Sequence, residues 1–351
     1  MRIKLLEFFG GIGAPRKALE NLGIEVKSID YVEILKDAVK AYNAMYSHDY
    51  TEQDILEWNN EVDLLVHGSP CQDFSKAGKN DLSSGRSILY QRTLEIIRNE
   101  LHPRPKYVLW ENVVGLLTKK HISNFYHYLN AMEEMGYKNY YGVINATEMG
   151  VPQSRNRVFT ISIRNDIDQV FDFDILRRHD LRPMRDYLVD FANSKPSTQP
   201  WFIDAIKNHK QRIIIDRTPT ISTRQERWDG GVCVNDEIFY NRDFTNLPRA
   251  KATSGYTIEE FLEYFPEYRD KPLSGMFRYL TPKECWLLQG FSEEDFEKAS
   301  SVVTSKTSLY HLAGNSICVQ VLEEIFRELL IEKRSQPKEI NLLEYKGENE
   351  E

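Results

Sequence analysis

The stretch that decides the fold is IKLLEFFGGIGAPRKALENLGIEVKSID, from Ile3 to Asp30. An apolar run of strand length leads into a glycine-rich turn, and helical spacing follows the turn and stops at Gly23. A second strand pattern comes after the helix. A strand, a crossover helix and another strand predict parallel pairing, which is the unit of an α/β sheet.

The same alternation continues through the first half of the chain and predicts a doubly wound parallel sheet. Further strands are predicted at 62–68, 106–113, 139–145 and 158–164, and further helices at 34–46, 88–101 and 124–136. After about Asn165 the pattern breaks into short, turn-rich pieces, which indicates a second, smaller and mixed domain. Helical patterns return at 281–291 and 316–330, and we expect the last helix to pack against the first part of the sheet.

Composition excludes several classes of protein. No apolar run approaches the roughly 20 residues of a membrane span, and the N-terminus is too short and polar for a signal peptide. Four scattered cysteines without a CxxC pair argue against a zinc site and a disulfide framework. We therefore expect a cytoplasmic protein without metal. The net charge of −8 disfavours nucleic acid, but residues 205–256 carry nine Lys and Arg against six Asp and Glu.

The segment DLLVHGSPCQDFSKAG places Cys71 directly after a strand and a Gly-Ser-Pro turn. Buried structural thiols are inert, whereas a cysteine at an exposed strand end can react. Cys71 is therefore a candidate nucleophile. The alternative is an ordinary loop cysteine.

The turn Gly10–Gly13 resembles a nucleotide-type site, because glycines allow close backbone approach and the helix start offers free N–H groups. Asp30 is predicted to end the second strand, where an acid can accept hydrogen bonds from ribose hydroxyls. Asp54 is a further acid, placed to read an adenine amino group. The alternative is that the glycines form only a tight turn.

Two further motifs lie at the ends of predicted strands, one where a strand finishes and one where a strand begins. Glu111 in WENV is expected at the carboxyl edge of the sheet, where burial beside Trp110 would favour a protonated carboxyl that can donate a proton. The alternative is a helix start with Glu in its first turn. In PQSRNRVF, Arg155 and Arg157 alternate into a strand and are expected to point to one side, toward a carbonyl, phosphate or carboxylate. The alternative is a basic strand end.

In this order and spacing the motifs resemble those of the cytosine carbon-5 DNA methyltransferases of bacteria and phages. The resemblance covers nearly the whole chain except about 165–276 and the tail. It rests on EFFGGIGAPRKALE, SID, GSPCQDFS, WENV, PQSRNRVF, RYLTPKECWLLQGF and LAGNSICVQVL. It implies a Rossmann-like catalytic domain formed by 1–172 and 305–335, a target-recognition domain with hinge at 173–304, and an acidic tail at 336–351.

The resemblance also implies a mechanism. Cys71 would attack carbon 6 of a flipped-out cytosine, and Glu111 would engage ring nitrogen 3 and the exocyclic amine. Arg157 looks like the arginine that holds the cytosine carbonyl oxygen, with Arg155 supporting the base and the catalytic loop. Polar residues after the cysteine would contact DNA, namely Gln72 and Ser75.

The implied cofactor is S-adenosylmethionine, which leaves as S-adenosylhomocysteine, and no metal is needed. The expected cofactor residues are Phe9, Gly11, Gly13, Asp30, Tyr31, Asp54, Pro70, Leu89, Asn315 and Ser316. Two of the chain's residues depart from the common pattern: Glu7 stands where many members carry aspartate, and Tyr31 where tryptophan or an apolar residue is frequent.

The segment TPTISTRQERWDGGVCV, 218–234, resembles the family's target-recognition element. Arg224, Gln225 and Arg227 can read base edges, although any of them could instead contact only phosphates. A competing candidate is RAKATSGYT, 249–257.

The expected partner is double-stranded DNA, bound by a monomer, with no membrane; a restriction endonuclease acting on the same site is a further candidate partner. Two alternatives stay open: a tRNA cytosine-5 methyltransferase of the same fold, and a catalytically inert DNA-binding regulator. Intact Cys71, Glu111, Arg155 and Arg157 disfavour the inert regulator.

Overall fold

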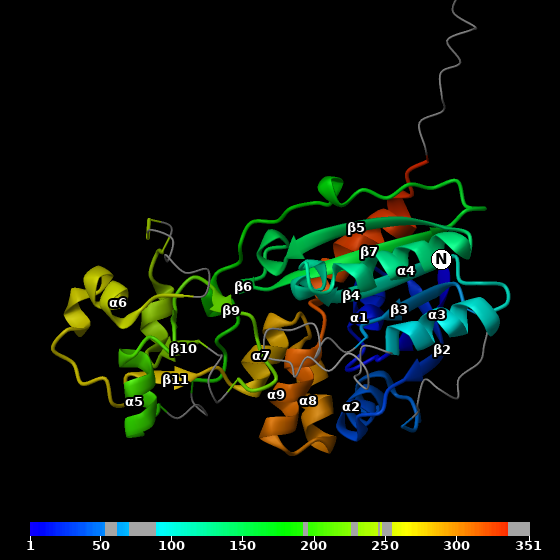
Figure 1. Cartoon of the computed structure of the whole chain (residues 1–351). Helices are drawn as coiled ribbons and strands as arrows, with labels where there is room; N and C mark the ends of the chain where they lie inside the picture. Colours follow the sequence, from blue (N-terminus) through cyan, green and yellow to red (C-terminus); the bar gives the residue numbers. More distant parts are fainter. Residues whose placement is uncertain are drawn as a thin grey trace, which may run out of the picture.

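The computed structural model describes residues 1–52, 62–69, 89–191, 196–225, 231–244, 246–247 and 255–335. It has two lobes, which lie side by side in Figure 1. The larger lobe is built around a six-stranded sheet, and the smaller lobe contains a three-stranded sheet. The predicted α/β class with a second, smaller and mixed region is therefore confirmed.

The large sheet has the strand order β2-β1-β3-β4-β7-β5. Its strands are β1 (Arg2–Phe8), β2 (Glu25–Val32), β3 (Leu64–His67), β4 (Tyr107–Val113), β5 (Tyr137–Asn145) and β7 (Asn156–Arg164). The pairs β1–β2, β1–β3 and β3–β4 are parallel, as predicted. β7 is antiparallel to both neighbours, so the prediction of a wholly parallel sheet is wrong for this strand. The connection between β5 and β7 is too short to hold the crossover helix that a parallel pair requires.

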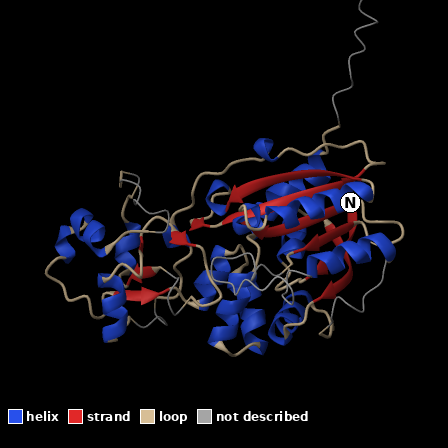
Figure 2. Ribbon diagram, in the orientation of Figure 1, coloured by secondary structure: helices blue, strands red, loops and turns tan. Residues whose placement is uncertain are grey.

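Helices cover both faces of the large sheet (Figure 2). They are α1 (Ala14–Asn21), α2 (Lys36–Tyr46), α3 (Leu89–Asn99), α4 (Ile122–Glu134) and α10 (Val319–Phe326). Successive strand residues point to opposite faces. Leu109 therefore joins the core shared with α1 and α10, whereas Val108 and Trp110 join the core shared with α3 and α4.

The last helix packs against the first one, as expected. α10 contacts α1, and the Asn21 side chain donates a hydrogen bond to the Glu323 carboxylate over 2.6 Å. The two ends of the large lobe's sequence are thereby joined.

The small lobe is mixed. It contains α5 (Pro200–Lys207), β8 (Ile213–Ile214), β10 (Val232–Val234), α6 (Ile258–Tyr264) and β11 (Phe277–Tyr279). β10 pairs with β8 in parallel and with β11 antiparallel. A two-stranded parallel sheet, formed by β6 (Gln153–Ser154) and β9 (Thr218–Pro219), lies between the lobes in Figure 1.

A buried ion pair ties the small sheet to α7 (Pro282–Leu288). Arg278 on β11 and Glu284 in the first turn of α7 are both fully buried, and two N···O distances of 2.8 Å join their side chains. The Glu284 carboxylate also accepts the backbone N–H of Thr281, which caps this helix. The pair therefore fixes the strand to the helix that follows it.

The helices α7, α8 (Glu293–Val302) and α9 (Lys306–Asn315) follow the small lobe in the chain. α8 packs against α2, and Lys17 forms an ion pair with Asp295 over 2.7 Å. These contacts place α8 with the large lobe, although it lies inside the range 173–304 assigned to the recognition domain. The sequence pattern could not show this, because the contact depends on how α8 folds back.

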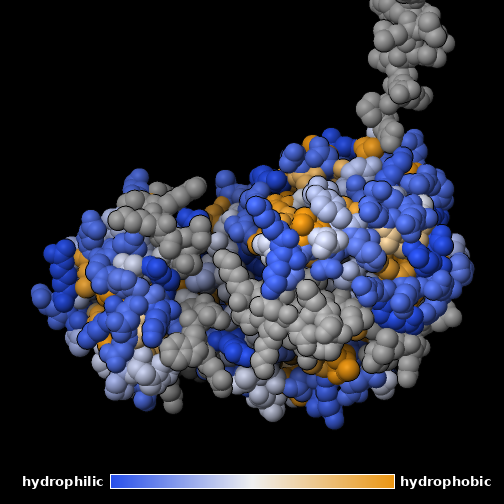
Figure 3. Space-filling view, viewed as in Figure 1, coloured by the Kyte–Doolittle hydropathy of each residue, from blue (hydrophilic) through white to orange (hydrophobic). Residues whose placement is uncertain are grey.

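The surface drawn in Figure 3 is mainly hydrophilic, with a few apolar patches. Within the described part of the chain, no helix combines the length and apolar character needed to cross a membrane.

Candidate active site

The carboxyl ends of three neighbouring strands reach one edge of the large sheet at the same level. Strand register pairs Phe8 with His67, and His67 with Trp110. The turns after β1 and β3 carry Gly10–Gly13 and Gly68–Ser69. Ligands bind at this edge in open α/β sheets. The predicted cofactor turn and the start of the cysteine segment are therefore brought together.

The turn after β1 requires its glycines. Gly11 and Gly13 have φ values of 55° and 73°, in the left-handed region. A Cβ atom at Gly10 would lie 2.6 Å from the Tyr31 ring, and one at Gly13 would lie 2.6 Å from the Tyr42 ring. At Gly11, by contrast, a Cβ atom would meet no described heavy atom within 4 Å apart from its chain neighbours. The backbone of Gly11 is therefore open to close approach.

Glu33 is the acid that the sequence reasoning missed. Asp30 was predicted to end the second strand, but β2 continues to Val32. Glu33 follows directly, and its mostly buried carboxylate accepts the N–H groups of Gly11, Ile34 and Leu35 at 2.9–3.0 Å. Burial raises the pKa of Glu33, and these backbone hydrogen bonds oppose the rise. The signal was available, because YVEIL continues the apolar strand pattern beyond Asp30.

Tyr31, predicted beside adenine, lies in the layer beneath the turn. Its side chain is fully buried and stacks on Tyr42 with ring centroids 3.9 Å apart. Its hydroxyl donates to the carbonyl oxygen of Gly11 over 2.5 Å. The visible function of Tyr31 is therefore to support the glycine turn from below.

The remaining predicted cofactor residues lie in several elements. Phe9 and Leu89 are partly buried against the core shared with α3 and α4. Asn315 is exposed at the end of α9, and Ser316 after it is buried. Asp54 and Pro70 lie outside the described residues.

Glu111 and Arg157 form an ion pair on one face of the sheet. Arg157 lies opposite Val113 in the β4–β7 ladder and hence diagonal to Glu111 on the same face. Its Nε lies 3.0 Å from Glu111 Oε1, and both side chains are largely buried. A Cβ atom on Gly68 would lie 3.5 Å from Glu111 Oε2. The ion pair therefore lies next to the start of the cysteine segment.

The expected effect of Trp110 on Glu111 is corrected by strand geometry. The two residues are neighbours in β4, so their side chains point to opposite faces, and Trp110 belongs to the core shared with α3 and α4. Instead, the charged neighbour of Glu111 is the Arg157 guanidinium.

Arg155 and Arg157 do not act on one group. Arg155 lies between β6 and β7, and its buried guanidinium donates to the carbonyl oxygens of Ile221, Gly314 and Ser316 at 2.6–3.1 Å. These carbonyls belong to the recognition segment and to the end of α9. Arg155 therefore joins segments from both lobes, while Arg157 faces Glu111.

The sequence of this chain also matches the model of a protein family. The model described as C-5 cytosine-specific DNA methylase matches residues 3–330. The chain belongs to this family. The prediction made from the ordered motifs is confirmed, and the protein is a methyltransferase.

Several methyltransferases are similar to this chain. The Type II methyltransferase M2.ScrFI of Lactococcus lactis subsp. cremoris is 33% identical over 274 residues, covering 77% of this chain and 67% of that protein. The orphan methyltransferase M.SPRI of Bacillus phage SPR is 25% identical and covers 94% of this chain and 98% of its own. The crystal structure of the S. pombe Dnmt2 methyltransferase, 20% identical, aligns with a TM-score of 0.71 over 94% of this chain and 99% of that one. This last likeness shows the fold.

The predicted nucleophile of this methylase can be compared with its other cysteines. Cys71, Gln72 and Ser75 lie outside the described residues. The three described cysteines, Cys233, Cys285 and Cys318, are all buried. Burial raises the pKa of Cys233 to about 12 and that of Cys318 to about 11. Such buried thiols are poor nucleophiles at neutral pH, and Cys71 stays the predicted nucleophile.

The predicted recognition residues differ in their exposure to solvent. Arg224 is exposed, as a base-reading side chain must be. Gln225 is fully buried and accepts the backbone N–H of Ser222 over 3.1 Å, so the prediction that it reads adenine does not fit its position. Arg227 and 249–254 lie outside the described residues.

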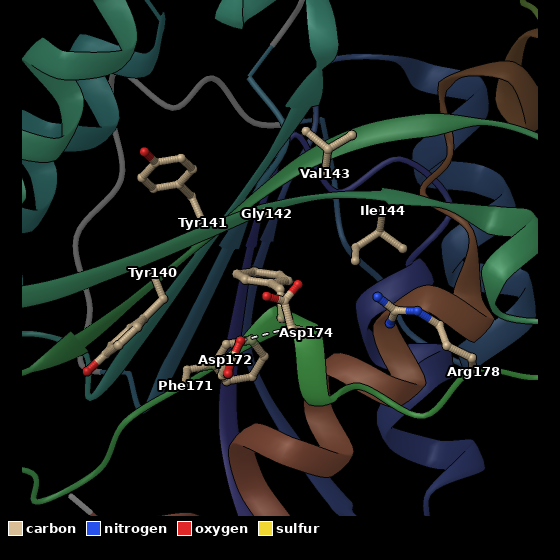
Figure 4. Close-up of a pocket in the computed structure, with 10 residues that line it drawn as sticks. Tyr140, Tyr141, Gly142, Val143, Ile144, Phe171, Asp172, Asp174 and Arg178 are labelled. Carbon is tan, nitrogen blue, oxygen red and sulfur yellow. Dashed lines mark hydrogen bonds between the residues drawn. The ribbon is translucent and has the colours of Figure 1, made fainter.

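A pocket at the free edge of the sheet is separate from these residues (Figure 4). It has a volume of about 190 Å³ and is lined by Tyr140–Ile144 of β5, by 171–174 and by Arg178. Arg178 is paired with Glu148, and the Asp172 carboxylate accepts the backbone N–H of Asp174. None of the predicted site residues lines this pocket. Among the described residues no group of three His, Cys, Asp or Glu side chains could hold a metal ion.

Glu7 beneath the glycine turn predicts a pH dependence. Its buried carboxylate accepts the Tyr42 hydroxyl over 2.7 Å, and burial raises its pKa from 4.5 to about 7. The unfolded chain ionises near pH 4.5, so the stabilisation by protonated Glu7 is full below that pH and is lost as the pH rises to about 7. Relative to Glu7→Gln, the wild-type free energy of unfolding should fall by about 3 kcal/mol between pH 4 and pH 8. Urea denaturation of both proteins at several pH values tests this. A difference that is constant with pH contradicts it.

Proposed function

We propose that this methylase is a DNA (cytosine-5-)-methyltransferase that forms a covalent adduct between Cys71 and a flipped-out cytosine in double-stranded DNA. The observation that carries the proposal is the Glu111–Arg157 pair beside Gly68. The Glu111 carboxylate lies near Gly68, which precedes Cys71 by three residues in the sequence, at the sheet edge where the glycine turn also lies. A carboxyl group can accept from the amine of cytosine and, when protonated, donate to its ring nitrogen, and a guanidinium can donate to its carbonyl oxygen.

The chemistry assigns a task to each group. Carbon 5 of cytosine is a poor nucleophile, and a bond from a thiolate to carbon 6 makes the ring electron-rich. Glu111 accepts a hydrogen bond from the amine and, as the carboxylic acid, donates its proton toward ring nitrogen 3, where negative charge develops, and Arg157 holds the carbonyl oxygen. Carbon 5 takes the methyl group as the bond between methyl and sulfonium breaks. Carbon 5 then gives its proton to solvent water, and the electron pair left by that proton restores the ring double bond as the bond from the cysteine sulfur to carbon 6 breaks. A stacked base cannot reach such groups, so the nucleotide must leave the duplex.

The residues around the glycine turn fit S-adenosylmethionine, which supplies the methyl group when bound and leaves as S-adenosylhomocysteine. Gly11 leaves its backbone open, and Glu33 places a mostly buried carboxylate at the end of the neighbouring strand. A carboxylate in this place can accept hydrogen bonds from ribose hydroxyls. Phe9 beside the turn offers an apolar surface. We assign Glu33 this task in place of Asp30.

A pair of variants tests this assignment. Glu33→Gln should weaken S-adenosylhomocysteine binding by about 10-fold, the expected cost of losing hydrogen bonds to a charged acceptor. Asp30→Asn is the matched control and should bind within about threefold of wild type. Isothermal titration calorimetry measures both. If Asp30→Asn weakens binding and Glu33→Gln does not, Asp30 is the ribose acceptor.

The substrate is tested by transfer of labelled methyl groups to unmethylated DNA and, in parallel, to total tRNA. Label at carbon 5 of cytosine in DNA supports the proposal, and bisulfite sequencing then gives the site. Label in tRNA alone would assign the same chemistry to RNA. No label in either, with cofactor bound, would support an inert DNA-binding regulator. The names of the relatives, which include Type II and orphan methyltransferases, favour DNA. They also make a restriction endonuclease with the same target a candidate partner.

A further inference from the structure

Ser69 is the last described residue before Pro70 and Cys71, and the sheet holds it at two points. The indole Nε1 of Trp110 donates to the Ser69 hydroxyl over 2.9 Å. The side-chain nitrogen of Asn112 lies 3.5 Å from the Ser69 carbonyl oxygen. All three side chains are at most 5% exposed, so water does not compete for these contacts. The contacts join β4 to the end of the adjacent strand β3.

Trp110 itself has a fixed orientation, because aromatic side chains surround its ring. Tyr128 lies 4.1 Å away between ring centroids, and His67 and Tyr90 each stack at 5.8 Å. The Tyr128 hydroxyl lies 3.1 Å from His67 Nε2, which holds two of these neighbours together. The indole N–H is therefore directed at Ser69 by packing and not by chance contact.

Covalent geometry restricts the path of the chain between Ser69 and the cysteine. The residue before a proline is restricted to extended backbone, and the proline ring locks its own φ near −65°. Few free torsions therefore separate the anchored Ser69 from the Cα atom of Cys71. Two residues also span at most about 7 Å. We therefore expect a change in the direction of Ser69 to shift the residue two positions further along the chain.

We propose that Trp110 is a positioning residue for the nucleophile. It acts through Ser69: the indole N–H fixes the Ser69 hydroxyl and so sets the direction in which the chain enters Pro70 and Cys71. The proposal rests on the proposed function, because it takes Cys71 as the reacting group. Glu111, the next residue of β4, points to the opposite face of the sheet from Trp110.

The test is Trp110→Phe, which keeps an aromatic ring and removes the N–H. The matched control is Trp286→Phe, because Trp286 is equally buried and donates its indole N–H to the Leu309 carbonyl, far from this strand in the fold. Trp110→Phe should lower kcat about 10-fold, with KM for DNA and for S-adenosylmethionine unchanged within about twofold. Trp286→Phe should leave kcat within about twofold of wild type. Alkylation of Cys71 by iodoacetamide, followed by mass spectrometry without DNA, should slow about threefold or more in Trp110→Phe alone.

Ser69→Ala completes the cycle. It should reproduce the loss in kcat, and the double variant Ser69→Ala/Trp110→Phe should lose no more than either single variant. Equal kcat and alkylation rates in Trp110→Phe and wild type would overturn the proposal, as would fully additive losses. The alkylation readout needs no nucleic acid, so it still decides the positioning role if methyl transfer proves to be directed at tRNA. Inactivity of Cys71→Ala with normal kcat in Trp110→Phe would leave the proposed function intact and remove the positioning role alone.

Discussion

Cys71→Ala is expected to reduce kcat for methyl transfer by about 10⁴-fold or more while leaving cofactor affinity near wild type. Without the thiolate no bond forms to carbon 6, and carbon 5 remains too electron-poor to accept the methyl group. The proposed cofactor residues Gly11 and Glu33 lie in the turn after β1 and directly after β2, away from the substituted position in the sequence. Single-turnover kinetics with labelled S-adenosylmethionine measures the loss, and calorimetry measures affinity.

The matched control for this prediction is Cys318→Ala. Cys318 is buried, and burial raises its pKa to about 11, so we expect its thiol to take no part in the reaction. The control should keep the wild-type kcat per folded molecule. A Cys71→Ala enzyme that still turns over would show that the nucleophile is another group.

Arg278→Met is expected to lower the free energy of unfolding by about 3–5 kcal/mol, the largest effect on stability that we predict. The substitution leaves the Glu284 carboxylate fully buried without its guanidinium partner. The remaining donors to Glu284 are the backbone N–H groups of Thr281 at 2.8 Å and Asp190 at 3.3 Å, which cannot neutralise the charge. Urea denaturation at pH 7 measures the change.

Two further proteins separate burial of the charge from loss of the contact. The double variant Arg278→Met/Glu284→Met should recover most of the stability, because no unpaired charge remains. Arg242→Met breaks a partly exposed ion pair with Glu267 and should cost no more than about 1 kcal/mol. Equal losses in Arg278→Met and Arg242→Met would show that burial does not set the cost.

The sequence was sufficient where local pattern determines structure. The alternation of strands and helices gave the sheet, and a glycine turn followed by Pro15 gave the start of α1. The ordered motifs also gave the family. Two errors were avoidable with the same rules: β2 continues to Val32, which makes Glu33 the terminal acid, and the two-residue period of a strand separates Trp110 from Glu111.

Other features depend on tertiary contacts that local pattern does not encode. The antiparallel direction of β7 follows from a short connection whose length is visible, but its pairing partners are not. Gln225 looks like a base-reading residue in RQER, yet it is buried because the segment folds over itself and against Gly314. Arg155 leaves the strand pattern to bind carbonyls from segments that are 66 and 161 residues away.

The junction between the lobes has a consequence for how such enzymes could acquire new targets. Gln153 bonds to the Leu288 carbonyl and the Ile221 N–H, Arg155 bonds to three carbonyls, and Thr218 donates its N–H to the Pro152 carbonyl. The partners of these three residues are main-chain atoms, which any amino acid supplies, and Thr220 adds one side-chain hydrogen bond from its hydroxyl to the Ser154 carbonyl oxygen. The hydrogen bonds of Pro152, Gln153 and Arg155 to these main-chain atoms therefore do not depend on the side chains of the segment that they hold. A foreign reading segment spliced between Ile221 and Leu288 would find its attachment ready, provided that it presents the same backbone path at its two ends.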